Sequence, residues 1–322
     1  MDRGETLMTC HFDKLFTRSV PHILEKIFFS LDYESYKKCL KVSNVWTELL
    51  TSESYQRRGK SVFHRDILMD WKDILMDWKQ ELTKELHDAL KKDNIIEIKR
   101  LVTTGMVDVN CKWGWAGDKK TPLFVAVRQS NKDVVHLLLK KGADTTEVVN
   151  YMGKTVLHEA AWNGNDSLVK ILLDFGADPK RADNHGRTPL YYAVRCGHKE
   201  VVEVLMDGGA DPNKPDNYLD NPLFRAVSFG HKDVAQLLLN KGADPERVNG
   251  YGLTPLHKAA WNGHNDLVRV LLDFGANPNR ADNQGGTPLN YAARNGHKEV
   301  VEDLMKAGAE PNSNKILMRL KK

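Results

Sequence analysis

Histidine is the side chain in this sequence with the widest chemical range, because it can hold a metal ion or transfer protons near neutral pH. Six of the twelve histidines recur at equivalent places, two after a Thr-x-Leu tripeptide and four after a glycine. These six are His158, His257, His198, His231, His264 and His297. Repetition of this kind is typical of hydrogen bonding within and between repeated units. We therefore expect structural histidines, with no metal site and no cofactor.

The sequence contains no other constellation typical of an enzyme. It lacks a Gly-x-x-x-x-Gly-Lys-Ser/Thr phosphate loop, a His-Glu-x-x-His zinc motif and a Gly-x-Ser-x-Gly nucleophile turn. The four cysteines (Cys10, Cys39, Cys111 and Cys196) are scattered, without the spacing of a zinc site or a disulfide framework. We predict a protein that binds rather than one that catalyses, with no catalytic residues.

The residues best suited to binding are aromatic and cationic, and they recur with the same period as the histidines. One column of equivalent positions reads Arg128, Trp162, Arg195, Ser228, Trp261 and Arg294. Tryptophan, tyrosine and arginine dominate protein interfaces, and arginine also recognises carboxylates. Two interpretations stay open at this point. The column is either a ligand surface, which we favour, or a structural ladder in which arginine stacks on tryptophan.

A repeated supersecondary unit must position these side chains. A Thr-Pro-Leu-x tetrapeptide or a close variant returns after 34 residues and then every 33, starting at Thr121, Thr155, Thr188, Asn221, Thr254 and Thr287. In each unit a turn precedes a threonine or asparagine that can cap a helix, and proline suits the first helical turn. A second amphipathic helix follows and ends at a Gly-Ala-Asp or similar sequence. No such unit buries its apolar face alone, so neighbours must stack.

The unit resembles the ankyrin repeat. The resemblance implies an all-α solenoid over residues 82–312 with about seven helix pairs, the first of them divergent because it lacks Thr-Pro-Leu. In ankyrin repeats, partners usually contact the hairpin tips and the exposed positions of the first helix, which line a concave groove. Carried over to this chain, the partner-binding residues are Arg128, Tyr151, Glu159, Trp162, Asn163, Tyr192, Arg195, Tyr218, Arg225, Phe229, Tyr251, Lys258, Trp261, Tyr291 and Arg294.

The N-terminal part has a different pattern. Apolar residues at helical spacing begin at Val20, with Pro21 at the helix start, and a second apolar set ends near Leu50. Residues 15–58 resemble an F-box, which implies docking on the Skp-type adaptor of a cullin ubiquitin ligase. The adaptor-binding positions would be Val20, Pro21, Ile23, Leu24, Ile27, Phe28, Leu31, Leu40, Val42 and Trp46. The alternative is that these short helices only cap the ankyrin stack.

The remaining segments complete the predicted organisation. Residues 1–14 form a polar lead, and residues 59–81, which contain a tandem Asp-Ile-Leu-Met-Asp-Trp-Lys heptad, form an amphipathic linker helix. Two heptads are too few to indicate a coiled coil, so we expect a monomer. Residues 313–322 form a short basic tail.

A longer period overlies the array, because a block of three repeats occurs twice. Ala160-Ala-Trp-Asn-Gly164 is identical to Ala259-Ala-Trp-Asn-Gly263, an offset of 99 residues. The pattern indicates either a block duplication without functional meaning or two similar surfaces on the order of 30 Å apart, since packed helices lie about 10 Å from each other. Near the C-terminus, Asp303 replaces the Val204 of the first block. We expect Asp303 to provide a polar end to the stack.

Composition limits the remaining classes of function and cellular location. The formal net charge is +4 over 322 residues, which is too small a bias to indicate nucleic acid binding. No apolar run is long enough for a membrane span, and no secretory signal is recognisable, so we expect a cytoplasmic or nuclear protein. Together these features predict a non-enzymatic substrate receptor of a Skp–cullin–F-box ubiquitin ligase whose ankyrin face holds a protein substrate. The alternative is a plain ankyrin scaffold or inhibitor.

Overall fold

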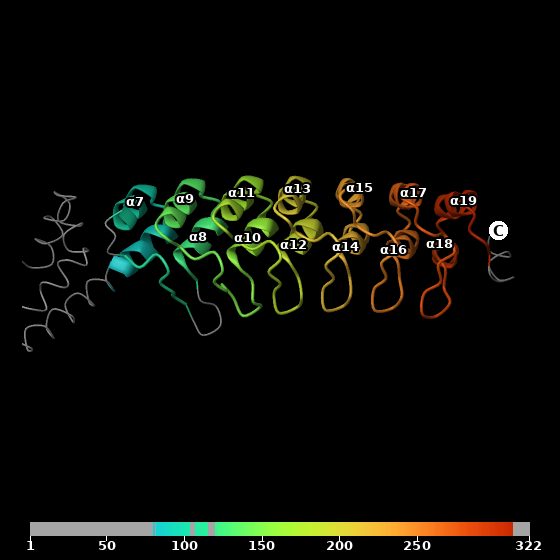
Figure 1. Ribbon diagram of the computed structural model, residues 1–322, viewed down its shortest axis with the longest axis horizontal. Coiled ribbons are helices and arrows are strands. Elements are labelled where there is room, and N and C mark those ends of the chain that lie inside the picture. Colours follow the sequence, from blue (N-terminus) through green and yellow to red (C-terminus); the bar gives the residue numbers. More distant parts are fainter. Residues whose placement is uncertain (1–79, 81, 104–106, 115–119, 312–322) are drawn as a thin grey trace, which may run out of the picture. The chain divides into compact units, whose positions relative to one another are not determined.

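A computed structural model describes residue 80 and residues 82–103, 107–114 and 120–311 (Figure 1). The chain divides into two compact units, residues 1–108 and 109–322. The polar lead, the F-box-like segment with its ten adaptor-binding positions, the linker helix apart from residue 80, and the basic tail lie outside the described residues. Their predicted boundaries remain predictions.

The described part of the first unit is one helix pair. Residues 82–91 are helical, and α7 follows at Ile95–Thr103. Leu86, Leu90 and Leu101 are completely buried, and Arg100 pairs with Glu97 and Glu85 on the surface. This is the divergent first repeat that the sequence predicts, formed without a Thr-Pro-Leu start.

The described part of the second unit contains six helix pairs. The first helices of these pairs are α8 (Pro122–Arg128), α10 (Val156–Asn163), α12 (Pro189–Cys196), α14 (Pro222–Ser228), α16 (Pro255–Asn262) and α18 (Pro288–Asn295). The second helices are α9 (Lys132–Lys140), α11 (Asp166–Asp174), α13 (Lys199–Asp207), α15 (Lys232–Asn240), α17 (Asn265–Asp273) and α19 (Lys298–Lys306). Each first helix packs on the first helix of the next pair, and the second helices do the same (Figure 1). The described residues thus confirm the all-α class and the repeated helix pairs, with one pair in the first unit and a solenoid of six stacked pairs in the second.

Local sequence explains where the helices begin and end. At α16, Thr254 lies in extended backbone and its hydroxyl accepts a hydrogen bond from the His257 backbone N–H, while Pro255 occupies the first turn. The helix ends at Gly263, whose φ of 73° lies in the left-handed region that favours glycine. The hairpins between repeats are turns in which an aspartate or asparagine accepts hydrogen bonds from the backbone two and four residues ahead. Asp183 accepts in this way from the backbone N–H groups of His185 and Arg187.

The histidines connect neighbouring repeats, as predicted. The four that follow glycine reach back to the end of the preceding first helix: His198 and His297 donate from Nε2 to the carbonyls of Trp162 and Trp261, at 3.1 and 3.0 Å. His231 reaches the Arg195 carbonyl at 3.1 Å. The last carbonyls of a helix have no intrahelical partner, so each of these bonds satisfies a terminal carbonyl and fixes the stacking of two repeats.

The expectation about Asp303 is wrong. Its side chain faces the preceding second helix instead of the end of the stack, and Arg269 of α17 donates to its carboxylate at 2.7 Å. An arginine on the neighbouring helix attracts the carboxylate inward. At the position that Val204 holds in the first block, the last repeat thus carries an ion pair to the preceding repeat.

Candidate functional site: the face of the first helices and hairpins

Aromatic side chains are exposed along the first helices. Trp162 at the end of α10 is 39% exposed, Trp261 at the end of α16 is 47% exposed, and Phe229 beside the end of α14 is 47% exposed. Arg128 and Arg294 are exposed, whereas Arg195 is half-buried. Large apolar side chains on a surface are informative when they are aligned with cations, because such a surface can exclude water from a partner.

The cluster around Trp162 combines rings with cations. The Lys154 ammonium lies 5.2 Å from the Trp162 ring centre and 4.0 Å from that of Tyr192, and the Arg195 guanidinium lies 5.3 Å from Trp162 and 5.9 Å from Phe229. Burial lowers the pKa of Lys154 from its ordinary value. The ladder interpretation thus has a basis in the geometry, since arginine does stack on tryptophan. Stacking does not compete with binding, because Trp162, Phe229 and the two cations all remain partly exposed.

Contrary to the sequence-based prediction, Tyr192 does not contribute to the exposed surface. It is only 1% exposed, and its hydroxyl donates to Asp183 Oδ2 at 2.6 Å. Burial and this bond raise the pKa of the Tyr192 phenol. The side chain packs beneath Trp162, with ring centres 5.7 Å apart, and fixes the hairpin to the helix nine residues later. Tyr291 makes the same bond to Asp282, and burial raises its pKa to about 12.

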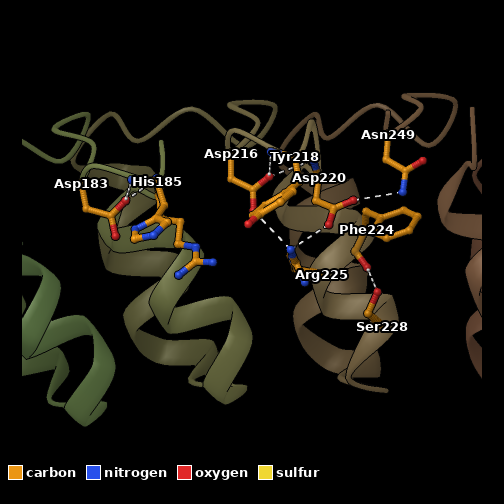
Figure 2. A network of polar contacts seen from close by, with 10 residues as sticks. Asp183, His185, Asp216, Tyr218, Asp220, Phe224, Arg225, Ser228 and Asn249 are labelled. Atoms are coloured by element: carbon orange, nitrogen blue, oxygen red, sulfur yellow. Dashed lines mark hydrogen bonds and ion pairs between the residues drawn. The ribbon is translucent and has the colours of Figure 1, made fainter. Parts of the chain in front are cut away.

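Arg225 occupies the position of Tyr192 in the next repeat and is engaged inside the protein. Its guanidinium lies 3.2 Å from Asp216 and 2.7 Å from Asp220, and Asn249 of the following hairpin donates to Asp220 at 3.1 Å. Figure 2 shows the two carboxylates above Arg225 on one hairpin. Burial raises the pKa of Asp220 even though Arg225 opposes this shift. Most of the charge of Arg225 is therefore neutralised within the protein.

The second block builds a related but different cluster. Trp261 stacks on Tyr291 with ring centres 5.1 Å apart, and the Lys258 ammonium lies 5.7 Å from Trp261. The positions that correspond to Lys154 and Arg187 are Leu253 and Gly286, and Glu159 is replaced by Lys258. The tryptophan and tyrosine are shared, but the charged side chains around them are not. The two blocks therefore do not present equivalent surfaces.

The hairpin tips carry exposed tyrosines. Tyr151, Tyr218 and Tyr251 are all more than half exposed, as the sequence predicts, and His185 is half-buried. A neighbour of Tyr218 was missed by sequence reasoning: Leu219 is 53% exposed and has a left-handed φ of 63°. The signal was present in the sequence, because the four equivalent positions are glycines (Gly153, Gly186, Gly252 and Gly285).

The other predicted positions have simple surroundings. Asn163 is exposed, and Glu159 is half-buried on α10. Lys154 and Arg187, which sequence reasoning did not select, lie at the base of their hairpins and complete the cluster around Trp162 and the neighbouring Tyr191. Within the described ranges, no three His, Cys, Asp or Glu side chains come together as a metal site would require, and no helix there is long and apolar enough to cross a membrane.

Comparison with known proteins agrees with this geometry. Residues 86–183, 157–249 and 223–315 match the family described as ankyrin repeats (3 copies), which together covers more than half of the chain. The chain belongs to the ankyrin-repeat family. The array is accordingly a protein–protein interaction module.

Individual relatives of this ankyrin-repeat chain share only short segments. It is 36% identical over 107 residues to the inactive serine/threonine-protein kinase TEX14 of Bos taurus, a match covering 33% of this chain and 7% of that protein. It is 33% identical over 100 residues to the probable E3 ubiquitin-protein ligase XBOS33 of rice (31% and 19%). It is 34% identical over 94 residues to the nuclear factor NF-kappa-B p105 subunit of Gallus gallus (29% and 9%). The chain thus spans less than a fifth of the length of these relatives.

Proposed function

We propose that this ankyrin-repeat protein is the substrate receptor of a Skp–cullin–F-box type ubiquitin ligase. Residues 15–58 would bind the Skp-type adaptor, and the face formed by the first helices and hairpins would hold a protein substrate. The observation that carries the binding half is the aligned row of Trp162, Arg195, Phe229 and Trp261, which is partly exposed and rich in interface-type side chains.

The ubiquitin half rests on the resemblance of residues 20–46 to an F-box. A relative of the array carries the name of a probable E3 ubiquitin-protein ligase, which is compatible with such a role but concerns that protein. The scattered cysteines suit a reducing compartment, so a cytoplasmic or nuclear location fits the proposal.

The protein would contribute position and no chemistry of its own. Holding a substrate close to the ligase raises the effective concentration of its lysines near the charged enzyme. A well-packed stack of repeats suits this task, because neighbouring repeats are tied by histidine bonds and by contacts between both layers of helices. A stiff holder restricts the geometries that the bound substrate can explore.

The test is co-purification of the full chain with a Skp-type adaptor, using the wild type beside Leu24→Asp. The control is Glu25→Ala, which lies off the predicted apolar stripe. We expect a complex with the wild type and the control but none with Leu24→Asp, while far-ultraviolet circular dichroism shows the array still folded in all three. Absence of a complex with well-folded wild type would refute the ubiquitin role.

A second pair of variants separates the two halves of the proposal. Trp162→Ala combined with Trp261→Ala should retain the adaptor and lose the substrate, since both side chains lie on the exposed row. The alternative function is a plain ankyrin scaffold or inhibitor whose N-terminal helices only cap the array. That alternative predicts that Leu24→Asp destabilises the array itself, which a shift of its thermal unfolding would reveal.

A further inference from the structure

Three cations in the first block have no ion-pair partner among the described residues. Among the residues that the structure describes, no carboxylate lies within 4.0 Å of the charged groups of Lys154, Arg187 or Arg195. Some other cations of the array are paired, for example Lys241 with Asp207 at 2.6 Å and Arg269 with Asp303 at 2.7 Å. Exposed cations elsewhere in the described array, such as Lys170 and Arg294, also lack an ion pair, so what distinguishes these three is their packing against aromatic rings.

Aromatic rings hold the three cations in place. Lys154 lies over Tyr192, Arg195 lies between Trp162 and Phe229, and Arg187 lies 5.1 Å from the ring of Tyr191. Among the described residues, the buried Nε atom of Arg187 has no hydrogen-bond partner. A cation already ordered by a ring loses less conformational freedom when it binds an anion.

The nearby carboxylates do not form ion pairs with these three cations. Asp183 is buried and accepts from Tyr192 and from the backbone N–H groups of His185 and Arg187, so its oxygens are committed to the hairpin. Glu159 is half-buried and attracts Lys154 only at longer range than an ion pair. The cluster has three cations against these two carboxylates, one of which is internal. It is complementary to an acidic partner.

The Leu219 hairpin, two repeats after the Lys154 hairpin, adds an exposed apolar side chain. Two sequence changes that depend on each other make this possible. Leu219 occupies a left-handed position that is glycine in the equivalent hairpins. In three of those hairpins, a side chain at that glycine would collide with an asparagine of the following hairpin, for instance Asn217 next to Gly186. After Leu219 the corresponding asparagine is replaced by Gly250. The second change removes the obstacle to the first.

These two coupled changes indicate that the exposed Leu219 side chain contacts a partner. A left-handed non-glycine residue costs about 1 kcal/mol, and an exposed leucine gains nothing from folding. Strain of this kind is kept where a surface needs a particular side chain. Together with its neighbour Tyr218, Leu219 forms an apolar projection on the same row of hairpins as Lys154 and Arg187.

We propose that the substrate segment recognised by this face is an extended acidic peptide whose carboxylates bind Lys154, Arg187 and Arg195, and whose apolar side chain binds Tyr218 and Leu219. Two repeats separate the Lys154 and Leu219 hairpins, which is on the order of 20 Å. Extended chain covers about 3.3 Å per residue, so the acidic and apolar anchors lie about six residues apart. This inference rests on the proposed function, because it names the class of substrate for the same face.

The experiment is selection of random peptides, about 16 residues long so that both anchors fit, on the immobilised full chain. Enriched peptides should contain two or more Asp or Glu residues and a leucine or aromatic residue about six positions away. Enrichment of peptides without that pattern, or no enrichment over an unrelated protein of similar charge, would overturn the proposal. A single-stranded RNA oligonucleotide that binds more tightly than every enriched peptide would also overturn it.

Fluorescence anisotropy with an enriched peptide then locates the contacts. Combining Arg187→Gln with Arg195→Gln should weaken binding about tenfold or more, as expected for lost charge-assisted hydrogen bonds. Leu219→Gly should weaken it about tenfold through the apolar anchor. The matched control is Lys170→Gln, an exposed cation on the second helix α11 of the repeat that contains Lys154, which should leave binding unchanged. An equal loss in the control, or none in the double variant, would contradict the assigned contacts.

These outcomes are independent of the adaptor test. Peptide binding with no adaptor complex would retain the acidic-peptide site and refute the ubiquitin role. An adaptor complex without acidic-peptide selection would retain that role and refute this inference.

Discussion

The histidine His158 couples the stability of the array to pH. The backbone N–H of Thr155 donates to its Nδ1 at 3.0 Å, so the neutral ring carries its proton on Nε2, which donates to the Arg187 carbonyl at 3.1 Å. Protonation of Nδ1 would remove the acceptor from Thr155 and place a charge in the core. Burial accordingly lowers the pKa of His158 from 6.5 to about 4.

The direction of the effect follows from this shift. The folded-state pKa is below the unfolded value, so the unfolded chain binds the extra proton first, and stability is lost as pH falls below the unfolded value of 6.5. Each pKa unit corresponds to about 1.4 kcal/mol. Between pH 7 and pH 4.5, His158 should therefore remove about 2.5 kcal/mol from the free energy of unfolding.

The chain itself suggests the control substitution. In the last repeat, Asn290 takes the place of His158 and accepts from the Thr287 N–H at 3.0 Å. His158→Asn should keep that bond without titrating, and it should lose the bond to Arg187, at a cost of about 1 kcal/mol at pH 7. Other titrating groups are common to both proteins and cancel in the comparison.

The assay is urea unfolding followed by circular dichroism at pH 7 and pH 4.5, with a nuclear magnetic resonance titration of the His158 ring. The loss of stability on acidification should be about 2.5 kcal/mol smaller in His158→Asn than in the wild type. A ring pKa near 6.5, or equal losses in the two proteins, would refute the reasoning.

Three further predictions concern the hairpins and the stacking of repeats. Leu219→Gly should raise the free energy of unfolding by about 1 kcal/mol by removing left-handed strain, and Gly250→Asn should be tolerated only in that background, which a double-mutant cycle in urea would show. Gly263→Ala should lower the free energy of unfolding more than Gly296→Ala. Both glycines are left-handed, but only at Gly263 would a methyl group collide with a histidine, His297. Equal losses of stability in the two variants would contradict this. Arg225→Met should lower the free energy of unfolding by about 3 kcal/mol at pH 7, because it leaves Asp216 and Asp220 unpaired. This loss of stability should shrink toward pH 5, because the pKa of Asp220 is raised. A loss that does not depend on pH would exclude the buried ion pair as its cause.

The sequence alone determined the repeat, its period and the order of its helices. Thr254, Pro255 and Gly263 define the start and end of a helix through local hydrogen bonding and backbone conformation, which do not depend on distant residues. The roles of the histidines also followed from their repetition. The ten adaptor-binding positions of the F-box-like segment remain a prediction of the sequence.

Only the tertiary structure decided which side chains of the first helices stay on the surface. Tyr192, Arg225 and Tyr291 occupy one sequence column, yet each turns toward an aspartate nine residues earlier, because a hairpin folds back over its own helix. Within the described residues, the same folding leaves Lys154, Arg187 and Arg195 without a carboxylate at ion-pair distance, and it brings Lys154 and Arg195 to aromatic rings of neighbouring repeats and Arg187 to Tyr191 of its own repeat. Charge pairing across repeats depends on distances between residues about 30 positions apart, and the repeat pattern does not fix those distances.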